Sequence, residues 1–383
     1  MSLLDDAIAR LPAMLDDALR IIECESPSDD LEAITRSARV VGEVLGARLA
    51  AAGLPSEPER IVHDGVTHLR WRLGGPTRVL LLGHHDTVWP HGSLVAHPAR
   101  VSDGVLTGPG CFDMAIGLVQ AAHACAALAE RDGADALAGV TLLVTGDEEV
   151  GSTTSRALLE DEARDAAAVL VLEASGPGGA LKSERKGVSL YTLAAHGRAA
   201  HAGLDPERGV NAGLELAAQL PRIAALGDPA TGTTVTPTRG IIGTTVNTVP
   251  AHAHVDVDVR ASTAAEQARV DAAIRALPPV TPGAQVTVSG GVNRPPLERA
   301  SAADLFARAA RLAPSLGIDG LAECSVGGAS DGNFTAGLGV PTLDGLGGVG
   351  GGAHAPDEHV EVAHVPARTA LLASLVADVG ERP

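Results

Sequence analysis

The sequence has few cysteines and few basic residues, and its first residues lack the pattern of a secretory signal. Its four cysteines form no Cys-x-x-Cys pair, which argues against a disulfide framework and a thiolate zinc site. Lys and Arg number 29 against 47 Asp and Glu, and the net charge of −18 opposes binding to nucleic acids or anionic membranes. This composition favours a small molecule or a peptide as the partner.

The N-terminal segment is acidic and amphipathic, and it lacks the basic start and continuous apolar stretch of a signal peptide. In the pattern of apolar residues, no segment approaches the roughly 20 residues that span a bilayer. We therefore expect a cytoplasmic protein. Its 383 residues suit two domains better than one.

An apolar segment, residues 140–144, is followed by three consecutive acids, Asp147, Glu148 and Glu149. Apolar residues without polar alternation predict a strand buried on both faces, as in a parallel sheet covered by helices. Open α/β sheets bind their ligands at the carboxyl ends of such strands. Three adjacent acids alone are more often a solvated turn. The same arrangement recurs along the chain, and this recurrence favours a site.

Two further apolar segments end in residues that can bind a metal. Residues 78–83 lead to His84 and Asp86, and a carboxylate beside a histidine often orients a metal ligand. A single histidine after a strand is more often structural. Residues 167–172 lead to Glu173. Three strands that each end in a histidine or an acid predict a site, because unpaired charges at one sheet edge repel unless a cation gathers them.

Two loops supply the remaining candidates. Asp113 follows a Gly/Pro loop and precedes an Ala-rich segment, residues 114–130, that predicts a helix. It fits equally well as the N-cap of that helix or as a ligand. His354 lies in a glycine-rich loop, residues 347–358, that lacks the Lys-Ser/Thr of a phosphate-binding loop. We interpret His354 as a ligand that the loop backbone presents.

The candidates supply two imidazoles and three carboxylates: His84, Asp113, Glu149, Glu173 and His354. Nitrogen and oxygen donors of this kind suit zinc, with cobalt or manganese as substitutes. Two metals are the economical interpretation, with Asp113 bridging a pair roughly 3.5–4 Å apart around a shared water. Glu148 is then free to take the proton of that water.

The central part of the chain follows a different pattern. Residues 183–294 predict strands and helices in the order βαββαβ, a ferredoxin-like unit inserted into the first domain. We therefore predict a catalytic α/β domain, residues 1–183 and 295–383, in which helices flank a mostly parallel sheet. The inserted domain covers residues 184–294.

The remaining segments have ordinary interpretations. Apolar spacing predicts helices over 3–22, 31–52 and 302–312, an edge hairpin over 61–73 and a strand over 340–344. The glycine-rich segment 325–334 is interpreted as a turn. A short basic run beside the inserted domain is more often a solvated loop than a site for an anionic substrate: Lys182, Arg185 and Lys186.

Taken together, these motifs resemble the M20 family of metallopeptidases, in particular its glutamate carboxypeptidase (carboxypeptidase G2-like) branch. Aminoacylases and acetylornithine or succinyl-diaminopimelate deacylases are relatives. The resemblance covers nearly the whole chain and rests on five segments: 83–88, 108–114, 145–152, 172–174 and 352–357. It implies a zinc-peptidase-like fold with an inserted dimerisation or lid domain.

The resemblance implies a hydrolase that releases a C-terminal amino acid, with glutamate as one candidate, from a peptidyl or N-acyl substrate. An N-acyl-amino-acid deacylase or a dipeptidase is the alternative. Glu148 would be the general base for attack by a hydroxide that bridges two zinc ions, and Asp86 would orient His84. The ions would share Asp113, with two ligand sets per subunit: His84, Asp113 and Glu173, and Asp113, Glu149 and His354.

The resemblance also implies roles for three residues of the inserted domain. His201 would reach the metal site of a partner subunit in a homodimer formed through this domain. Asn247 and Arg260 would contact the substrate, with the arginine holding a carboxylate. One position departs from the family, which usually has Lys after its Asp-Met pair where this chain has Ala115. A catalytically weak or inactive binding homologue is therefore the second hypothesis.

Overall fold

The computed structural model of the chain describes residues 2–380, which form two compact units. Residues 2–184, 299–326 and 330–380 make up unit 1. Unit 2 consists of Arg185–Glu298 and Gly327–Ala329. Each unit has its own sheet and its own buried core.

Unit 1 begins with two long helices where apolar spacing predicts them. α1 (Leu3–Ile22) is capped by Ser2, and α2 (Leu31–Ala51) is capped by Asp30. Each cap side chain accepts hydrogen bonds from backbone amides of the first turn, which otherwise have no partner in the helix. The apolar faces of both helices are buried.

The main sheet of unit 1 has six strands in the order β1-β2-β6-β3-β7-β14. β6, β3, β7 and β14 run parallel, and β1 and β2 form the predicted antiparallel edge hairpin. Every residue of β3, β6 and β7 is buried, as their unbroken apolar sequences predict. The bounds are β1 (Glu59–His63), β2 (Val66–Arg72), β3 (Val79–His84), β6 (Val140–Thr145), β7 (Ala168–Val171) and β14 (Thr342–Leu343).

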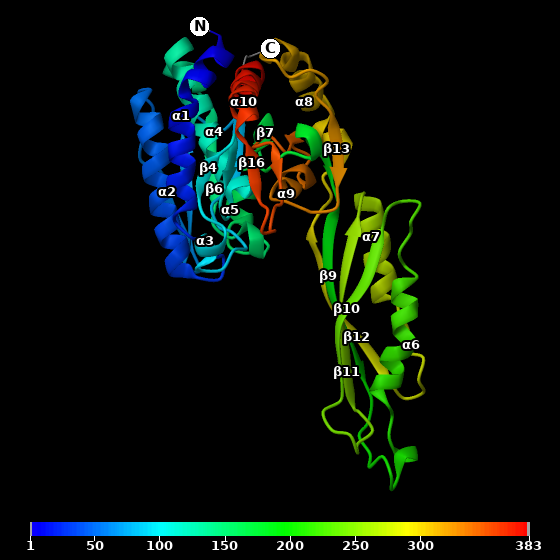
Figure 1. The fold of residues 1–383 in the computed structure, drawn as a ribbon. Helices are drawn as coiled ribbons and strands as arrows, with labels where there is room; N and C mark the ends of the chain where they lie inside the picture. The colour runs from blue at the N-terminus through cyan, green and yellow to red at the C-terminus, as the bar shows by residue number, and fades with distance from the viewer. Residues whose placement is uncertain (1, 381–383) are drawn as a thin grey trace. The chain divides into compact units, whose positions relative to one another are not determined.

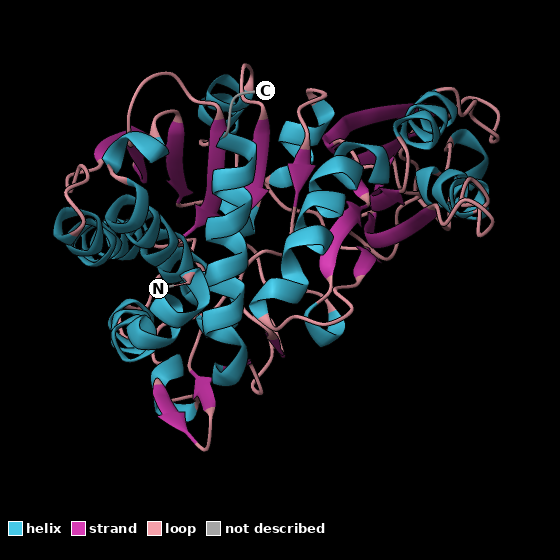
Figure 2. Cartoon of the chain, turned by 90° about the horizontal axis from the view of Figure 1, so that it is seen from above, coloured by secondary structure: helices cyan, strands magenta, loops and turns pink. Residues whose placement is uncertain are grey.

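Helices cover both faces of this sheet, as the predicted α/β class requires. α1, α4 (Ile116–Asp132) and α10 (Val365–Gly380) lie side by side on one face (Figures 1 and 2). On the other face, α5 (Arg156–Ala163) and α9 (Gly332–Gly337) bury apolar side chains against β3 and β7. The sheet edge between these layers is where the strands deliver their polar residues.

A second sheet of unit 1 joins two loops that are far apart in the sequence. Its strands follow the order β15-β16-β5-β4, and Val360 of β16 lies opposite Leu106 of β5. This pairing brings the loop after β5, which carries Asp113, to the loop between β15 and β16, which carries His354. The bounds are β4 (Arg100–Ser102), β5 (Val105–Thr107), β15 (Gly350–Gly351) and β16 (His359–Glu361).

Several elements of unit 1 differ from the sequence interpretation. The glycine-rich segment before Phe334 is not only a turn, because α9 begins at Gly332. A two-stranded pair and the C-terminal helix α10 were not predicted at all. The two strands of this pair are β8 (Leu181–Arg185) and β13 (Glu323–Val326). Unit 1 also contains the helices α3 (Ser93–Ala96) and α8 (Arg299–Leu312).

Within residues 2–380, two helices are long and apolar enough to span a bilayer, so the expectation that no segment approaches this length is wrong. They are Cys111–Asp132 and Val362–Gly380. However, 94% and 61% of the most apolar 18-residue stretch in each helix, respectively, are buried inside the protein. These helices form the core of unit 1, and their hydrophobicity is explained by that packing.

Unit 2 has the predicted order βαββαβ, and its antiparallel sheet follows the order β10-β11-β9-β12. α6 and α7 lie on the same face of this sheet (Figure 1). Side chains on the other face, which we call the open face, alternate with the buried core residues along β9 and β11. The bounds are β9 (Gly187–His196), α6 (Ala212–Ala224), β10 (Thr234–Ile242), β11 (His252–Ala261), α7 (Ala264–Arg275) and β12 (Gln285–Arg294).

Candidate functional site

Three parallel strands of unit 1 bring polar side chains to one sheet edge. His84 ends β3 and lies opposite Thr145, the last residue of β6. Glu148 and Glu149 occupy the turn that follows β6, and Glu173 comes two residues after β7. The predicted meeting of these strand ends is confirmed, and the solvated turn is excluded for Glu148, which is only 7% exposed.

The carboxylate of Asp113 divides its two oxygens between two histidines. Oδ1 lies 3.3 Å from Nε2 of His84, and Oδ2 lies 3.3 Å from Nε2 of His354. A second carboxylate joins each pair. Oε1 of Glu173 is 3.5 Å from Nε2 of His84, and Oε2 of Glu149 is 3.2 Å from Nε2 of His354. The result is two groups of three donors that share Asp113.

These separations suit bound metal ions. Donors that hold one tetrahedral ion at about 2.0–2.2 Å lie roughly 3.4 Å from one another. The buried Oε1 of Glu149 has no hydrogen-bond partner among the described residues, which is costly unless a cation compensates it. Glu148 also has a carboxylate oxygen within 4.8 Å of donor atoms of His84 and Glu173. It can therefore act beside the ions or as a further ligand.

Asp86 supports this cluster in two ways. Nδ1 of His84 donates to the backbone carbonyl of Asp86 at 2.9 Å, so a neutral ring has its lone pair on Nε2, the nitrogen beside Asp113 and Glu173. The Asp86 carboxylate is 3.5 Å from the same nitrogen. Its two oxygens accept hydrogen bonds from the backbone amides of Glu148 and Glu149, each at 3.1 Å. Asp86 thus orients His84 mainly through its backbone and holds the acidic turn through its side chain.

The protonation of the histidines reflects the surrounding acids. Burial opposes a charge on His84, but hydrogen bonds to Asp113, Asp86 and Glu173 outweigh it and hold the pKa well above its usual value. Hydrogen bonds that the ring donates to Asp113 and Glu149 raise the pKa of His354 to about 10. Carboxylates that favour a proton at these nitrogens also favour a metal cation in its place.

Backbone geometry argues against ordinary roles for two of these residues. Asp113 has a non-helical backbone, and the N-cap position of α4 is Ala115, which makes no side-chain cap, so the N-cap interpretation of Asp113 is wrong. His354 has a φ of 64°, in the left-handed region that non-glycine residues seldom adopt. A strained conformation of this kind persists where the surrounding structure requires the side chain in one place.

Comparison with known proteins identifies the family. The sequence profile of the peptidase family M20/M25/M40 matches residues 80–378. The chain belongs to this family. It is 30% identical over 381 residues to carboxypeptidase G2 from Pseudomonas sp. (strain RS-16), covering 96% of this chain and 90% of that protein. It is therefore a hydrolase of the metallopeptidase type, as the motifs predict.

Solved structures share the fold at lower sequence identity. An aminopeptidase, PepT, from Bacillus cereus is 22% identical with a TM-score of 0.73, covering 97% of this chain and 99% of that chain. A dinuclear metal-binding M20 peptidase, YxeP, from Bacillus subtilis is 15% identical with a TM-score of 0.65, covering 97% and 98%. At these identities the likeness establishes the common architecture of this M20 member and its neighbours.

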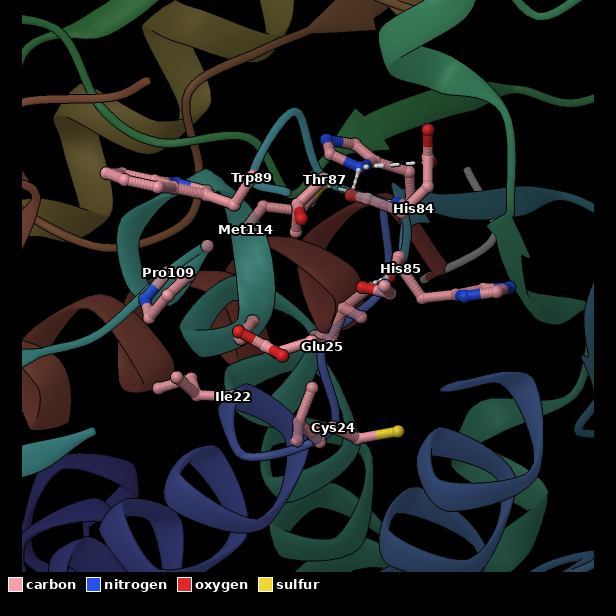
Figure 3. Close-up of a pocket in the computed structure, with 15 residues that line it drawn as sticks. Ile22, Cys24, Glu25, His84, His85, Thr87, Trp89, Pro109 and Met114 are labelled. Atoms are coloured by element: carbon pink, nitrogen blue, oxygen red, sulfur yellow. Dashed lines mark hydrogen bonds and ion pairs between the residues drawn. The ribbon is translucent and has the colours of Figure 1, made fainter. Parts of the chain in front are cut away.

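Ala115, where the M20 family usually has Lys, lies outside the donor groups. It is buried, and its amide donates to the carbonyl of Gly110 at 2.9 Å. It lines a cavity of about 20 Å³ that also borders His84, Trp89 and Glu25 (Figure 3). A cavity of this size holds about one water molecule. Ala115 therefore contributes to the lining of the cavity beside His84, and all five candidate ligands are retained.

Glu358 is a supporting residue that the sequence interpretation missed, because nothing in the pattern separates it from the acids of a surface loop. It is fully buried. Its Oε1 accepts the amides of Phe112 and Asp113 at 2.9 and 3.0 Å, and its Oε2 accepts the amide of Gly110 and the Trp89 indole. Glu358 thereby ties the loop that carries Asp113 to the segment that follows His354.

We expect Glu358→Gln to lower the free energy of unfolding by roughly 2–3 kcal/mol, because the new amide group faces buried N–H donors and hydrogen bonds to a charged acceptor are lost. Urea unfolding of the metal-loaded protein measures the change. Glu361→Gln is the matched control, since this acid three residues further along is exposed and contacts only His364 among the described ion pairs. It should shift stability by less than about 0.5 kcal/mol. Equal shifts would exclude a special role for Glu358.

Lys182 is a second supporting residue, and its interpretation as a solvated loop residue is wrong. Its side chain is 12% exposed, and Nζ lies 4.0 Å from Oε2 of Glu173. The other oxygen of Glu173 faces His84. One oxygen of this carboxylate is thus directed to the donor group and the other to an ammonium.

We expect Lys182→Met to tighten metal binding roughly tenfold, because a positive charge near the ions opposes them. Competition with a chelator of known affinity measures the change. Lys182→Arg retains the charge and should stay close to the wild type. Weaker binding in the Met variant would show instead that the ammonium acts mainly by holding Glu173 in place.

The other predicted site residues belong to unit 2. Nδ1 of His201 accepts the amides of Gly203 and Leu204, so its ring proton lies on Nε2. Asn247 is close to His201, because its carbonyl accepts the amide of Ala202 at 2.9 Å.

Arg260, also in unit 2, forms a two-point ion pair with Asp258, its neighbour on the open face of β11. The two contacts are both 2.9 Å long. A substrate carboxylate would compete with Asp258 for this guanidinium.

Proposed function

We propose that this M20 member is a carboxypeptidase-type amide hydrolase that releases a C-terminal amino acid from a peptidyl or N-acyl substrate. The observation that carries the proposal is the division of the Asp113 oxygens between two donor groups, with Glu148 beside them. The 30% identity to carboxypeptidase G2 over nearly the whole chain supports this choice within the family. Glutamate is one candidate for the released residue.

The proposed cofactor is a pair of zinc ions per subunit, with cobalt or manganese as substitutes. His84, Asp113 and Glu173 would hold one ion, and Asp113, Glu149 and His354 the other; nitrogen and oxygen donors of this kind fit such ions. When bound, the ions polarise a carbonyl oxygen and make a water acidic enough to react near neutral pH.

The residues of the chain then divide the proton transfers and the orientation. Glu148 takes the proton of the attacking water and returns it to the nitrogen of the leaving amine. Asp86 holds the amide of Glu148 and so fixes the position of the base. Nε2 of His201 donates to the carbonyl oxygen as that atom becomes negative. Asn247 and Arg260 bind the substrate, with Arg260 exchanging Asp258 for the substrate carboxylate.

We further propose that unit 2 is the inserted dimerisation domain and that the protein is a cytoplasmic homodimer. β10 and β12 are the edge strands of its sheet. Exposed edges of this kind can pair across a two-fold axis. In such a dimer, His201 serves the metal site of the partner subunit.

Hydrolysis of a substrate panel tests the function. Zinc- or cobalt-loaded protein is incubated with N-acyl-glutamates, other N-acyl amino acids and dipeptides, and the released amino acid is quantified. Preference for acylated or peptidyl glutamate supports the carboxypeptidase. Preference for N-acetyl or N-succinyl substrates, or for dipeptides, would instead place the chain among the deacylases or dipeptidases of the family.

Metal analysis distinguishes an active enzyme from a catalytically weak or inactive homologue. Ala115 is the only feature that suggests the second alternative. The proposal expects bound metal in the purified protein and hydrolysis of at least one panel member. Little bound metal and no turnover after reloading would overturn it.

A further inference from the structure

Three histidines lie together on the open face of the unit 2 sheet. His196 ends β9 and lies directly opposite His252, the first residue of β11. His254 follows two residues later and therefore projects from the same face. Their strand neighbours Ala195 and Ala253 belong to the buried core. The imidazoles consequently lie on the side of the sheet away from α6 and α7.

The first two rings are placed as ligands of one ion would be. Nδ1 of His196 is 3.3 Å from Nδ1 of His252. The rings are nearly perpendicular, at 80°, with their centroids 5.6 Å apart. Two imidazole nitrogens about 2.0–2.1 Å from a tetrahedral zinc ion lie roughly 3.3–3.4 Å from each other. The observed separation therefore needs little movement to accept an ion.

The surroundings of the pair favour the same arrangement. Nε2 of His196 lies 3.0 Å from the hydroxyl oxygen of Thr287 on β12. When this nitrogen donates to Thr287, the lone pair of the ring lies on Nδ1, and such an outer partner is typical of metal-binding histidines. His254 lies opposite Ala194, whose small side chain leaves room for the imidazole to turn toward His252. Residues two apart on a strand are roughly 7 Å apart, which is within reach of a histidine side chain.

We propose that His196, His252 and His254 form a second transition-metal site, separate from the acidic donor groups of unit 1. Three neutral imidazoles without a carboxylate suit a late first-row divalent ion such as zinc, nickel or copper. The ion would join the end of β9 to the beginning of β11. Binding to the folded sheet alone would stabilise unit 2 in proportion to the free metal concentration.

Metal counting on the untagged full-length protein tests the site. Wild type, His252→Ala and His196→Ala are dialysed against the same buffered free zinc, and the zinc per chain is measured by mass spectrometry. We expect each variant to hold one equivalent less than wild type. Because the zinc content of each variant is compared with that of wild type, the result does not depend on how many ions the unit 1 donor groups hold. Circular dichroism in chelator checks that the variants are folded.

Two further variants distinguish a specific metal site from non-specific binding of zinc to exposed histidines. Thr287→Val removes only the outer partner of His196 and should weaken binding of the additional ion about 10–100-fold. His364→Ala is the control, because this exposed histidine contacts Glu361 and lies in unit 1. It should retain the full zinc content. The proposal is overturned if the His196 and His252 variants hold as much zinc as wild type, or if His364→Ala loses as much as they do.

Discussion

Glu148→Gln should leave the metal content of the protein unchanged and lower turnover by roughly 10²–10⁴-fold, the usual range for the loss of a general acid–base group. The amide has nearly the same size as the carboxylate but cannot accept the proton of the attacking water. The backbone amide of Glu148 would still bind Asp86, so the turn after β6 should keep its place. Steady-state kinetics and metal analysis of the same preparation measure both effects.

The neighbouring acid provides the matched control. Glu149→Ala should lose one metal, because its Oε2 lies 3.2 Å from His354 in one donor group. Loss of metal from Glu148→Gln would assign Glu148 as a ligand, a role that its closeness to His84 and Glu173 permits. Two ions retained in Glu149→Ala would remove Glu149 from the proposed ligand set.

His201→Ala should lower turnover by roughly 10²–10³-fold, which corresponds to the loss of one oxyanion donor, about 2.7–4 kcal/mol. The ring proton on Nε2 is available because Nδ1 accepts two backbone amides. His201 lies on unit 2, whereas every proposed ligand lies on unit 1. The proposal that it serves the partner subunit therefore makes a prediction about mixed dimers.

Mixing two inactive homodimers should restore activity. In a dimer of one His201→Ala chain and one Glu148→Ala chain, one site combines an intact Glu148 with an intact His201 from the other chain. Incubation under conditions that exchange subunits should regain up to half of the wild-type activity per mixed dimer. If activity stays absent while subunit exchange is demonstrated, His201 acts within its own chain or has no catalytic role.

Much of the fold was predictable because local patterns and the final environment agree. The unbroken apolar runs that end at His84 and Thr145 form fully buried parallel strands. The order βαββαβ in unit 2 followed from alternation in strands and helical spacing between them. α10 was missed because its apolar residues occur on nearly all sides, so no clear helical period marks it.

The candidate site was predictable only in part. The donor residues stood out because each ends a strand or lies in an unusual loop, as His354 does. Glu358 and Lys182 gave no such signal, since their roles depend on contacts made across long sequence separations. The hydrogen bond from His84 to the backbone carbonyl of Asp86 could not be predicted for another reason. Sequence shows which side chain is present and not which of its groups faces a neighbour.

The proposed division of roles between the units has a consequence for changing specificity. All five proposed ligands and Glu148 lie on unit 1, whereas Asn247, Arg260 and His201 lie on Arg185–Glu298. If these roles hold, randomised libraries confined to that segment should alter substrate preference without changing a proposed metal ligand. The Arg260–Asp258 pair is a natural starting point, because replacing Asp258 frees the guanidinium for other acceptors. With the proposed arrangement, the enzyme would acquire new substrates while the hydrolytic chemistry stays the same.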